Sequence, residues 1–471
     1  MTALGASVLW LGWSSRHWPL IHDAPLMHYV AWRIAGGAVP YRDLFDMNAP
    51  GVYLIHLIVL EVLGGGDAAW RIFDLAWLAL CCGLVVLYAR PFGAVPAACG
   101  ALLFALYHLA GGAWLAGQRD FLLCAFLLGG ALLINDPRGS GRLLLVGALG
   151  GAAVIVKPPA VLFVGLLTVA GAWLAARAGG SPVRAAGLVA LGSAAAPLGC
   201  LAWLAAVGGL PELVNVFASY VLPLYSRLAR VSAWMALGWW PFGRWVWALL
   251  GILVVADCAT VRWERRRTLA IAGVAYGVIH FVVQGKGWEY QLYPLAAFAC
   301  LSAGIALGTP SVLPQWTAIT ATALLAVTLT TKGIQERSPS WIVAKGERVD
   351  RIVSELSGRL GPGDTVQVLD TSEGGIDALF RLRARQPSRF IYDFHFFHDQ
   401  DHPVIQHLRA ELMAALVSHP PRFVVVLEKG WPSGGFERIG RFPELQAWLD
   451  ARYRLDREGD GYRIYAKRAH S

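Results

Sequence analysis

The stretch DAAWRIFDLAWLALCCGLVVLYA, residues 67–89, decides the fold class of this chain, and its last fifteen residues carry no charge. A helix needs about 20 mostly apolar residues to cross a bilayer, so this stretch predicts a transmembrane helix. Ten other stretches have the same character, near 2–13, 92–113, 119–134, 143–157, 159–177, 185–208, 243–259, 268–284, 294–308 and 314–331. We therefore expect an all-α polytopic membrane domain with about eleven transmembrane helices.

The charged residues divide the chain into two regions. Residues 1–331 hold 31 charged side chains, whereas residues 332–471, less than half as long, hold 40. The first region is too poor in charge for water and the second too rich for lipid, so we expect a transmembrane domain followed by one soluble domain. An overall charged fraction of 15% and a hydrophobic fraction of 56% exclude a disordered chain and an ordinary cytosolic enzyme.

The net charge of +9 lies mostly in the first region. We expect this charge to orient the protein and to contact membrane lipids, and not nucleic acid, because the soluble region is nearly neutral. All seven cysteines also lie in apolar stretches of the first region. The sequence therefore indicates neither a disulfide framework nor a thiolate metal site.

Alternate loops of the first region are short and basic, which is typical of the cytoplasmic side of membrane proteins. These loops carry Arg90, Arg138, Arg142, Arg177, Arg184 and the cluster from Arg262 to Arg267. The loops on the other side are longer and mix cations with acids, aromatic residues, Gly and Pro. We therefore expect the N-terminus inside the cell and the soluble domain outside it. Trp239 and Trp240 fit an aromatic belt at the membrane interface.

Residues 332–471 alternate strand and helix patterns, which predicts a small α/β domain. The expected strands are 365–370, 389–394 and 422–428, together with a hairpin that pairs 453–456 with 462–466. The expected helices are 375–384, 403–418 and 443–451.

The first external loop, about residues 14–66, is the most informative segment. It reads HDAPLMHY at 22–29, AWRIAGGAVPYRDLFD at 31–46 and MNAPGVY at 47–53. Apolar residues between polar ones suit amphipathic helices that lie in the membrane interface. Such helices would hold Asp23, Asp43 and Asp46 at the membrane surface, where a lipid headgroup meets a water-borne partner.

This loop resembles the first external loop of the GT-C class of membrane glycosyltransferases, in the bacterial branch related to the protein O-mannosyltransferases and the lipid A aminoarabinose transferase. The resemblance rests on Asp23, on Gly-x-x-Pro-Tyr-x-Asp at 37–43 and on Asn-Ala-Pro-Gly at 48–51. It continues in QRDF at 118–121, KPP at 157–159 and QGKGWEYQLYP at 284–294. The resemblance implies a GT-C-like membrane fold with an external α/β tail.

The resemblance also implies a transferase that uses a sugar linked to a polyprenyl phosphate. Asp23 would be the catalytic base, and Asp120 would assist the base or bind the sugar or a metal. Lys286, Arg119 and Lys157 would hold the donor phosphate. The remaining candidate substrate-binding residues are Tyr41, Asp43, Asp46, Glu289 and Tyr290.

Elementary chemistry supports these roles. An Asp within hydrogen-bond reach can take the proton of an acceptor hydroxyl, and cations such as Lys286 and Arg119 can stabilise the charge on a leaving phosphate. Direct displacement with one base predicts inversion at the sugar carbon. Two positions depart from the family, because Ala24 follows Asp23 where relatives have Glu, and Asn48 stands where relatives have Lys. We therefore assign no cofactor, and a divalent cation stays an open alternative.

The acidic candidates also have structural explanations. Asp23 precedes a helical run and can act as an N-cap. Asp43 can form a turn with Arg42, and Asp120 can form an ion pair with Arg119 at a helix start.

The other candidates have structural explanations as well. Lys157 can reach the interface by snorkelling, and Gly285 to Gly287 can be a plain turn between two helices. In the tail, His395 to His402 contains His and Asp at spacings that suit a divalent metal, but a capped, solvated loop explains the segment more simply.

We therefore expect a glycosyltransferase of the bacterial inner membrane. It would move a sugar from a polyprenyl-phosphate donor to a glycan, lipid or protein acceptor on the outer face. The alternative is a transporter or a flippase for lipid-linked sugars, which would use the same charged residues as an ion-coupled pathway. Transporters usually contain internal repeats and broken helices at mid-membrane, and this sequence shows neither.

Overall fold

A computed structural model describes residues 1–136, 139–232, 235, 243–260 and 263–468. Arg138, Trp239, Trp240 and Arg262, discussed above, lie outside the described residues. A helix is found at each of the eleven expected apolar stretches. These helices are α1 (Thr2–Ser14), α4 (Asp67–Ala89), α5 (Ala94–Ala110), α6 (Arg119–Ile134), α7 (Ser140–Val156), α8 (Val161–Arg177), α9 (Pro182–Val207), α12 (Arg244–Cys258), α13 (Arg265–Gln284), α14 (Tyr293–Leu307) and α15 (Gln315–Gln335).

Six described segments are long and apolar enough to cross a membrane. They are Asp67–Phe92, Pro158–Arg177, Pro182–Val207, Arg265–Gln284, Glu289–Leu307 and Gln315–Leu356. Ala94–Ala110 and Ser140–Val156 are apolar but shorter. The helical positions are therefore as expected, while the number of eleven spans remains a prediction.

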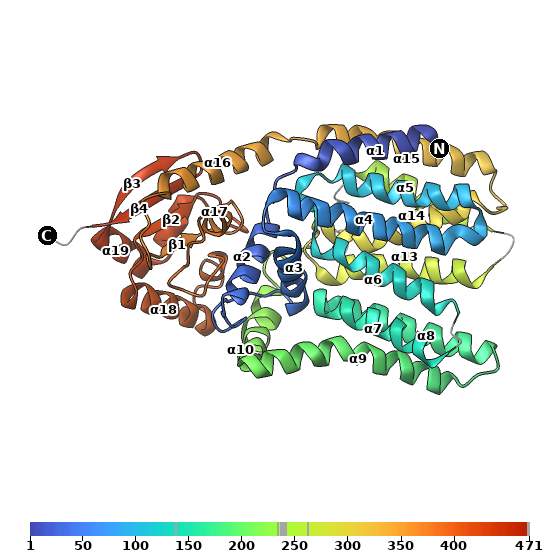
Figure 1. The fold of residues 1–471 in the computed structure, drawn as a ribbon, viewed down its shortest axis with the longest axis horizontal. Coiled ribbons are helices and arrows are strands. Elements are labelled where there is room, and N and C mark those ends of the chain that lie inside the picture. The colour runs from blue at the N-terminus through green and yellow to red at the C-terminus, as the bar shows by residue number, and fades with distance from the viewer. Residues whose placement is uncertain (137–138, 233–234, 236–242, 261–262, 469–471) are drawn as a thin grey trace.

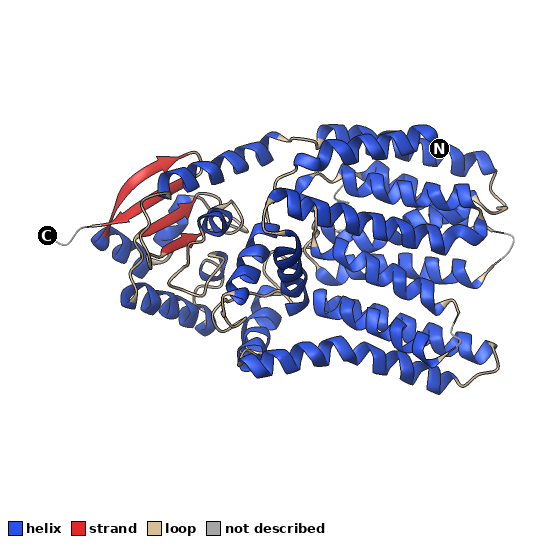
Figure 2. Cartoon of the chain, viewed as in Figure 1, coloured by secondary structure: helices blue, strands red, loops and turns tan. Residues whose placement is uncertain are grey.

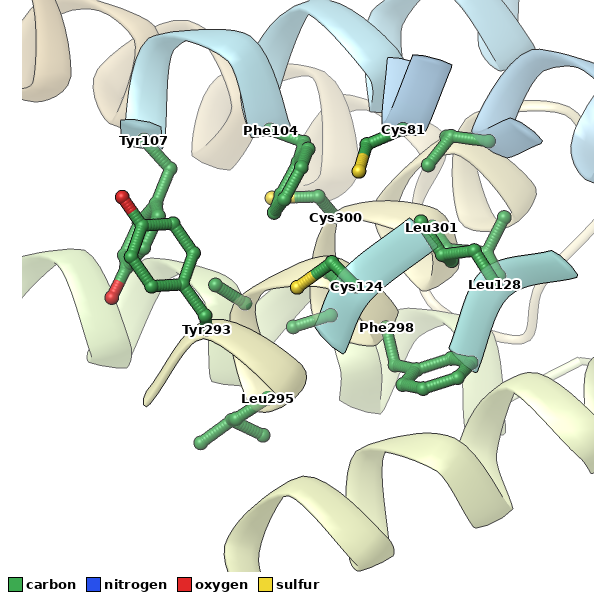
Figure 3. Packing of buried hydrophobic residues seen from close by; sticks show 14 of the residues in the cluster. Cys81, Phe104, Tyr107, Cys124, Leu128, Tyr293, Leu295, Phe298, Cys300 and Leu301 are labelled. Atoms are coloured by element: carbon green, nitrogen blue, oxygen red, sulfur yellow. The ribbon is translucent and has the colours of Figure 1, made fainter. Parts of the chain in front are cut away.

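Helix α14 lies at the centre of the bundle and is buried along almost its whole length. Figure 3 shows Tyr293, Phe298 and Cys300 of α14 packed among side chains of the neighbouring helices, including Cys81 and Cys124. Sulfur and ring atoms fill this core, and all seven cysteines are free thiols.

Helices α7 and α9 approach each other through glycine. A Cβ atom on Gly147 would lie 2.1 Å from the Val189 carbonyl oxygen, and one on Gly192 would lie 2.1 Å from the Leu144 carbonyl oxygen. Only glycine permits backbones this close, and small residues at such crossings are typical of helix pairs in membranes.

The C-terminal region forms an α/β domain at one end of the bundle (Figures 1 and 2). Its sheet has the order β1 (Val366–Leu369), β2 (Phe423–Leu427), β4 (Tyr462–Lys467) and β3 (Tyr453–Gly459). Strands β1 and β2 are parallel, and the other pairs are antiparallel. The helices are α16 (Ser340–Leu356), α17 (Gly375–Leu382), α18 (Pro403–Ser418) and α19 (Pro443–Arg452). The proposed boundary after residue 331 lies within α15.

The predicted strand at 389–394 is wrong. This segment is irregular, and the Phe45 amide donates a hydrogen bond of 2.8 Å to the Arg389 carbonyl oxygen. Phe390 and Tyr392 are buried. They pack against the first loop and the cavity described below, not within the sheet. A run of buried aromatic residues reads as a strand when the partner that buries it is far away in the sequence.

The first loop contains α2 (Ala24–Ala35) and α3 (Pro50–Leu63), which lie between the bundle and the α/β domain (Figure 1). Helices are therefore present in this loop, as expected, while their position in the membrane interface remains a prediction. Helix α2 packs against α17, and its residues Ala24 to Ala31 are buried. One hydrophobic core includes Tyr29 and Phe45 of the loop together with the strands of the α/β domain. The loop and the tail are thus packed as one body.

Candidate functional site

A cavity of about 390 Å³ lies where the first loop, the membrane bundle and the α/β domain meet. The first loop contributes His22, Asp23 and Met47, and the bundle contributes Trp114, Arg119, Tyr225, Trp288 and Tyr290. The α/β domain contributes the remaining wall, formed by 371–373, Tyr392, Phe394 and 429–432. Its volume is in the range of small-molecule binding sites.

Asp23 stands at the N-cap position of α2, but its side chain makes no capping hydrogen bond. Instead its Oδ2 atom accepts hydrogen bonds from Arg119 Nη2 at 3.2 Å and from Gln118 Nε2 at 3.5 Å. Burial raises the pKa of Asp23, but the charge of Arg119 and the hydrogen bond from Gln118 oppose this, and the pKa lies below its usual value. Asp23 is therefore ionised and faces the cavity at neutral pH.

Arg119 is the first residue of α6 and is held from two sides. Its Nη2 atom also lies 3.4 Å from the Tyr290 hydroxyl, and its Nη1 atom donates a hydrogen bond to the Asn48 side-chain oxygen. Asn48 in turn donates to both carboxylate oxygens of Asp46, at 2.9 and 3.0 Å. The guanidinium group is thus fixed beside Asp23 at the cavity wall.

Asp46 is buried and anchors the segment of the first loop that leads into α3. It accepts a 2.6 Å hydrogen bond from the Tyr53 hydroxyl and one of 2.7 Å from the Met47 amide. Burial raises the pKa of Asp46, although these hydrogen bonds and those from Asn48 oppose that shift. In this geometry Asp46 orients Asn48, which contacts Arg119.

Asp120 and Lys157 lie behind the cavity wall and contact each other. The Lys157 ammonium lies 3.1 Å from Asp120 Oδ2, and His280 Nε2 lies 2.6 Å from Oδ1. Gln284 donates a further hydrogen bond of 3.1 Å to Oδ1. Lys157 also lies 5.5 Å from the centre of the Tyr290 ring, which lines the cavity. The partner of Asp120 is therefore Lys157, and not its chain neighbour Arg119.

Lys286 is held in the turn between α13 and the 3-10 helix Glu289–Leu292. The turn needs glycine on both sides, because Gly285 and Gly287 have φ of 63° and 68°. The ammonium donates hydrogen bonds to the carbonyl oxygens of Tyr225, at 2.8 Å, and Leu228. It lies 4.6 Å from the Tyr225 ring centre, so it sits just behind a residue of the cavity wall.

The remaining candidates occupy different places. Tyr290 lines the cavity, and Glu289 precedes it in the same 3-10 helix. Tyr41 is buried and donates a 2.7 Å hydrogen bond to the Asn48 carbonyl oxygen. Asp43 is more exposed and pairs with Arg42 at 2.9 Å, as a local turn would. The structure thus brings Asp23, Arg119 and Tyr290 to the cavity, keeps Asp120, Lys157 and Lys286 just behind it, and leaves Asp43 away from its lining.

No protein-family model matches this sequence, and no curated protein matches it either. The solved structures do contain similar folds. ArnT from Cupriavidus metallidurans bound to undecaprenyl phosphate is 15% identical, with 99% of this chain and 97% of ArnT aligned and a TM-score of 0.65. The ArnT structure in the apo state gives the same values. This chain has the GT-C fold.

A more distant match is the archaeal oligosaccharyltransferase AglB from Archaeoglobus fulgidus, in complex with an inhibitory peptide and a dolichol-phosphate. It is 12% identical, with 99% of this chain and 74% of AglB aligned and a TM-score of 0.48.

The sequence predictions missed the wall that the α/β domain adds to this GT-C bundle. Residues 371–373 follow β1 and residues 429–432 follow β2, so both lie at the carboxyl ends of two parallel strands. Ligands bind at that edge in open α/β sheets. The predicted strands at 365–370 and 422–428 therefore indicated where such a binding edge could lie. The sequence did not show that this edge faces the first loop, a contact that the packing of α2 against α17 makes.

Among the described residues, no three His, Cys, Asp or Glu side chains are gathered as metal ligands. In the segment 395–402, His395 Nδ1 and His398 Nε2 both contact the Tyr220 hydroxyl, at 2.6 and 3.0 Å. These two histidines therefore join the α/β domain to the membrane bundle. A divalent cation stays an untested expectation of the sequence.

Proposed function

We propose that this protein is a membrane glycosyltransferase that transfers a sugar from a polyprenyl-phosphate donor to an acceptor, with Asp23 as the general base. The observation that carries the proposal is the cavity in which ionised Asp23 and Arg119 face each other within a GT-C fold. The ArnT structure of the same fold was solved with undecaprenyl phosphate bound.

The reaction assigns a role to each charged group. The acceptor hydroxyl gives its proton to Asp23 while its oxygen bonds to the anomeric carbon of the sugar. The bond between that carbon and the phosphate oxygen breaks, and its electron pair leaves with the lipid phosphate. Arg119, supported by Lys286 behind the wall, stabilises this charge. Asp23 is the carboxylate beside Arg119 on the wall, whereas Asp120 is paired with Lys157, and Glu373 of the wall is paired with Lys345 and Arg348. This arrangement supports direct displacement with inversion.

We place the cavity and the α/β domain on the outer face of the bacterial inner membrane. The short basic loops support this orientation. A cysteine introduced as Asp350→Cys, on the exposed face of α16, tests it. We expect a membrane-impermeant maleimide to label this variant in intact spheroplasts, and protection until lysis would reverse the orientation.

Radiolabelled donor tests the reaction. The full chain in lipid nanodiscs is given an undecaprenyl-phosphate pentose or hexose and an envelope extract as acceptor. We expect labelled product from the wild type, and a loss of about 10²–10⁴-fold in Asp23→Asn, because a positioned base contributes that much. Asp450→Asn on α19 is the matched control, and NMR of the product gives the anomeric configuration.

Two results would contradict this proposal. Undiminished transfer by Asp23→Asn would remove Asp23 as base. Movement of labelled lipid across the bilayer without formation of a new glycosidic bond would favour the flippase alternative.

A further inference from the structure

His22 and Asp23 line the cavity side by side, and the gap between their polar atoms is wide enough for one oxygen atom of a ligand. His22 Nε2 lies 3.9 Å from Asp23 Oδ1, too far for a direct hydrogen bond. Both side chains line the cavity, with exposed fractions of 25% and 19%. Arg119 and Gln118 occupy Oδ2, whereas Oδ1 accepts no side-chain hydrogen bond from the part of the chain that the structure describes.

The tautomer of His22 follows from Lys345 of α16. The Lys345 ammonium lies 3.1 Å from His22 Nδ1. A lysine side chain can only donate to an imidazole, so Nδ1 accepts and the ring proton lies on Nε2. Lys345 is itself fixed, because its ammonium group donates a 2.9 Å hydrogen bond to the Ser372 carbonyl oxygen and lies 3.4 Å from the Glu373 carboxylate.

The His22 ring is held in place and uncharged. The Trp114 and Trp341 rings meet it edge-on, with centres 5.5 and 6.4 Å away. Burial and the charge of Lys345 lower the pKa of His22 to about 4, although Asp23 opposes this. The backbone of His22 has φ of 64°, a left-handed conformation that His and Asn tolerate better than most residues. The Nε2–H group therefore points from a fixed ring toward the gap.

We propose that the gap between His22 Nε2 and Asp23 Oδ1 is the seat of the attacking hydroxyl group of the acceptor. This inference rests on the proposed transferase function. A hydroxyl oxygen about 2.8 Å from each atom fits a separation of 3.9 Å. It accepts a hydrogen bond from Nε2–H, donates its own proton to Oδ1, and keeps a second lone pair for the anomeric carbon. The proton then passes to Asp23 as the C–O bond forms and the phosphate leaves with its electrons.

This arrangement selects the chemical class of the acceptor. An amide nitrogen or an ammonium group has no lone pair to receive Nε2–H, so one polar group would be left unpaired. A phosphate acceptor has no proton for Oδ1, and its charge would face the Asp23 carboxylate. The seat therefore suits an alcohol.

An adjoining pocket indicates which alcohol. It measures about 620 Å³ and shares His22, Glu373 and Lys429 with the cavity. Trp341 supplies an aromatic wall, and Arg348 adds a further polar group. One aromatic face with several hydrogen-bonding side chains suits a ring that carries many hydroxyl groups, so we commit to a sugar hydroxyl.

Two substitutions of His22 test whether the acceptor hydroxyl binds in the gap between His22 and Asp23. His22→Asn tolerates the left-handed backbone and can still accept from Lys345, but its side chain is too short to supply the Nε2 donor. His22→Gln places an amide N–H near the Nε2 position. His407→Asn, on the exposed face of α18, is the matched control.

The experiment uses the full chain in nanodiscs with a radiolabelled undecaprenyl-phosphate sugar. The acceptor probes are octyl glucoside, an acylated Ser peptide and dodecyl phosphate. We expect the wild type to prefer octyl glucoside and His22→Asn to raise its KM about tenfold, as loss of one hydrogen bond would. His22→Gln should recover part of this loss. The affinity for undecaprenyl phosphate should stay unchanged, which a general structural defect would not allow.

Two outcomes would overturn the seat while leaving the transferase in place. They are an unchanged KM in His22→Asn and preferred transfer to dodecyl phosphate. Preferred transfer to the Ser peptide, which also offers an alcohol, would overturn only the commitment to a sugar hydroxyl. An electron cryo-microscopy map with undecaprenyl phosphate bound decides the matter even if no probe reacts. We expect an oxygen atom bridging Nε2 and Oδ1, and direct contact between these atoms would overturn the proposal. If the wild type transfers from no lipid-linked donor, the proposed function itself falls.

Discussion

The Lys157 ammonium lies 3.1 Å from the carboxylate of Asp120, and the pair lies behind the wall of the cavity, with Asp120 fully buried and Lys157 partly buried. Asp120 directly follows Arg119, whose guanidinium contacts Asp23. Lys157 thus neutralises the acid that adjoins Arg119 in the chain. Arg119 consequently contacts Asp23, and in the proposed reaction it is also available to the donor phosphate.

The pair predicts a characteristic pattern of stability. Asp120→Asn and Lys157→Gln should each destabilise the protein by about 3–5 kcal/mol, because each leaves a buried charge without its partner. The double variant should lose less than the sum, since both charges are gone. Thermal unfolding in detergent, followed by tryptophan fluorescence, measures all three. Additive losses would show that the two side chains do not interact.

The contacts of Asn48 with Arg119 and Asp46 lead us to expect an effect on donor binding when Asn48 is replaced. Asn48→Ala removes the hydrogen bond that orients Arg119, and it deprives buried Asp46 of two contacts. The Kd for undecaprenyl phosphate should rise about tenfold or more, because a hydrogen bond to a charged group contributes about 1.5–3 kcal/mol. Asn215→Ala at the end of α10 (Leu210–Asn215) is the control and should bind like the wild type. Equal affinities for the two variants would remove the positioning role of Asn48.

Lys286 predicts a pH dependence. Burial, with a smaller contribution from Arg230, lowers the pKa of Lys286 to about 8. The ammonium is therefore charged below pH 8 and loses its charge above it, well before an ordinary lysine does. The Kd for undecaprenyl phosphate should be about tenfold weaker at pH 9 than at pH 7. Lys286→Arg keeps its charge and should remove this step, and a wild-type Kd that is flat up to pH 9 would exclude Lys286 from phosphate binding.

We expect substitution of Gly117 to lower both stability and transfer activity. It has φ of 68°, and a Cβ atom there would lie 2.0 Å from the Trp70 ring. Its amide donates a 2.7 Å hydrogen bond to Asp74, which fixes the turn that leads into Arg119. Gly117→Ala should cost about 1–3 kcal/mol and lower transfer. Gly199→Ala, where a Cβ meets open space, should do neither, and a fully active Gly117→Ala would show that this turn does not position Arg119.

Local patterns predicted the helices because each apolar run carries its own signal, as 67–89 does. The family resemblance singled out Asp23 and Arg119 as candidates, and the structure brings both to the cavity wall. Local patterns could not predict that Lys157 is the partner of Asp120, or that 371–373 and 429–432 close the cavity. Those contacts join segments far apart in the sequence, and no periodicity encodes which side of a sheet meets which helix. The strand expected at 389–394 fails for the same reason.

The shared core of the first loop and the tail has a consequence for biosynthesis. Arg389 donates a 2.8 Å hydrogen bond to the Tyr41 carbonyl oxygen across 348 positions of the chain. At about 5–20 residues per second, the ribosome needs roughly 20 to 70 s to supply that partner. During this interval the face of α2 that packs against α17 stays uncovered, because α17 has not yet been synthesised. The nascent chain therefore completes the walls of the cavity only when translation is almost over, and a truncated product would leave the cavity open on the side of the α/β domain.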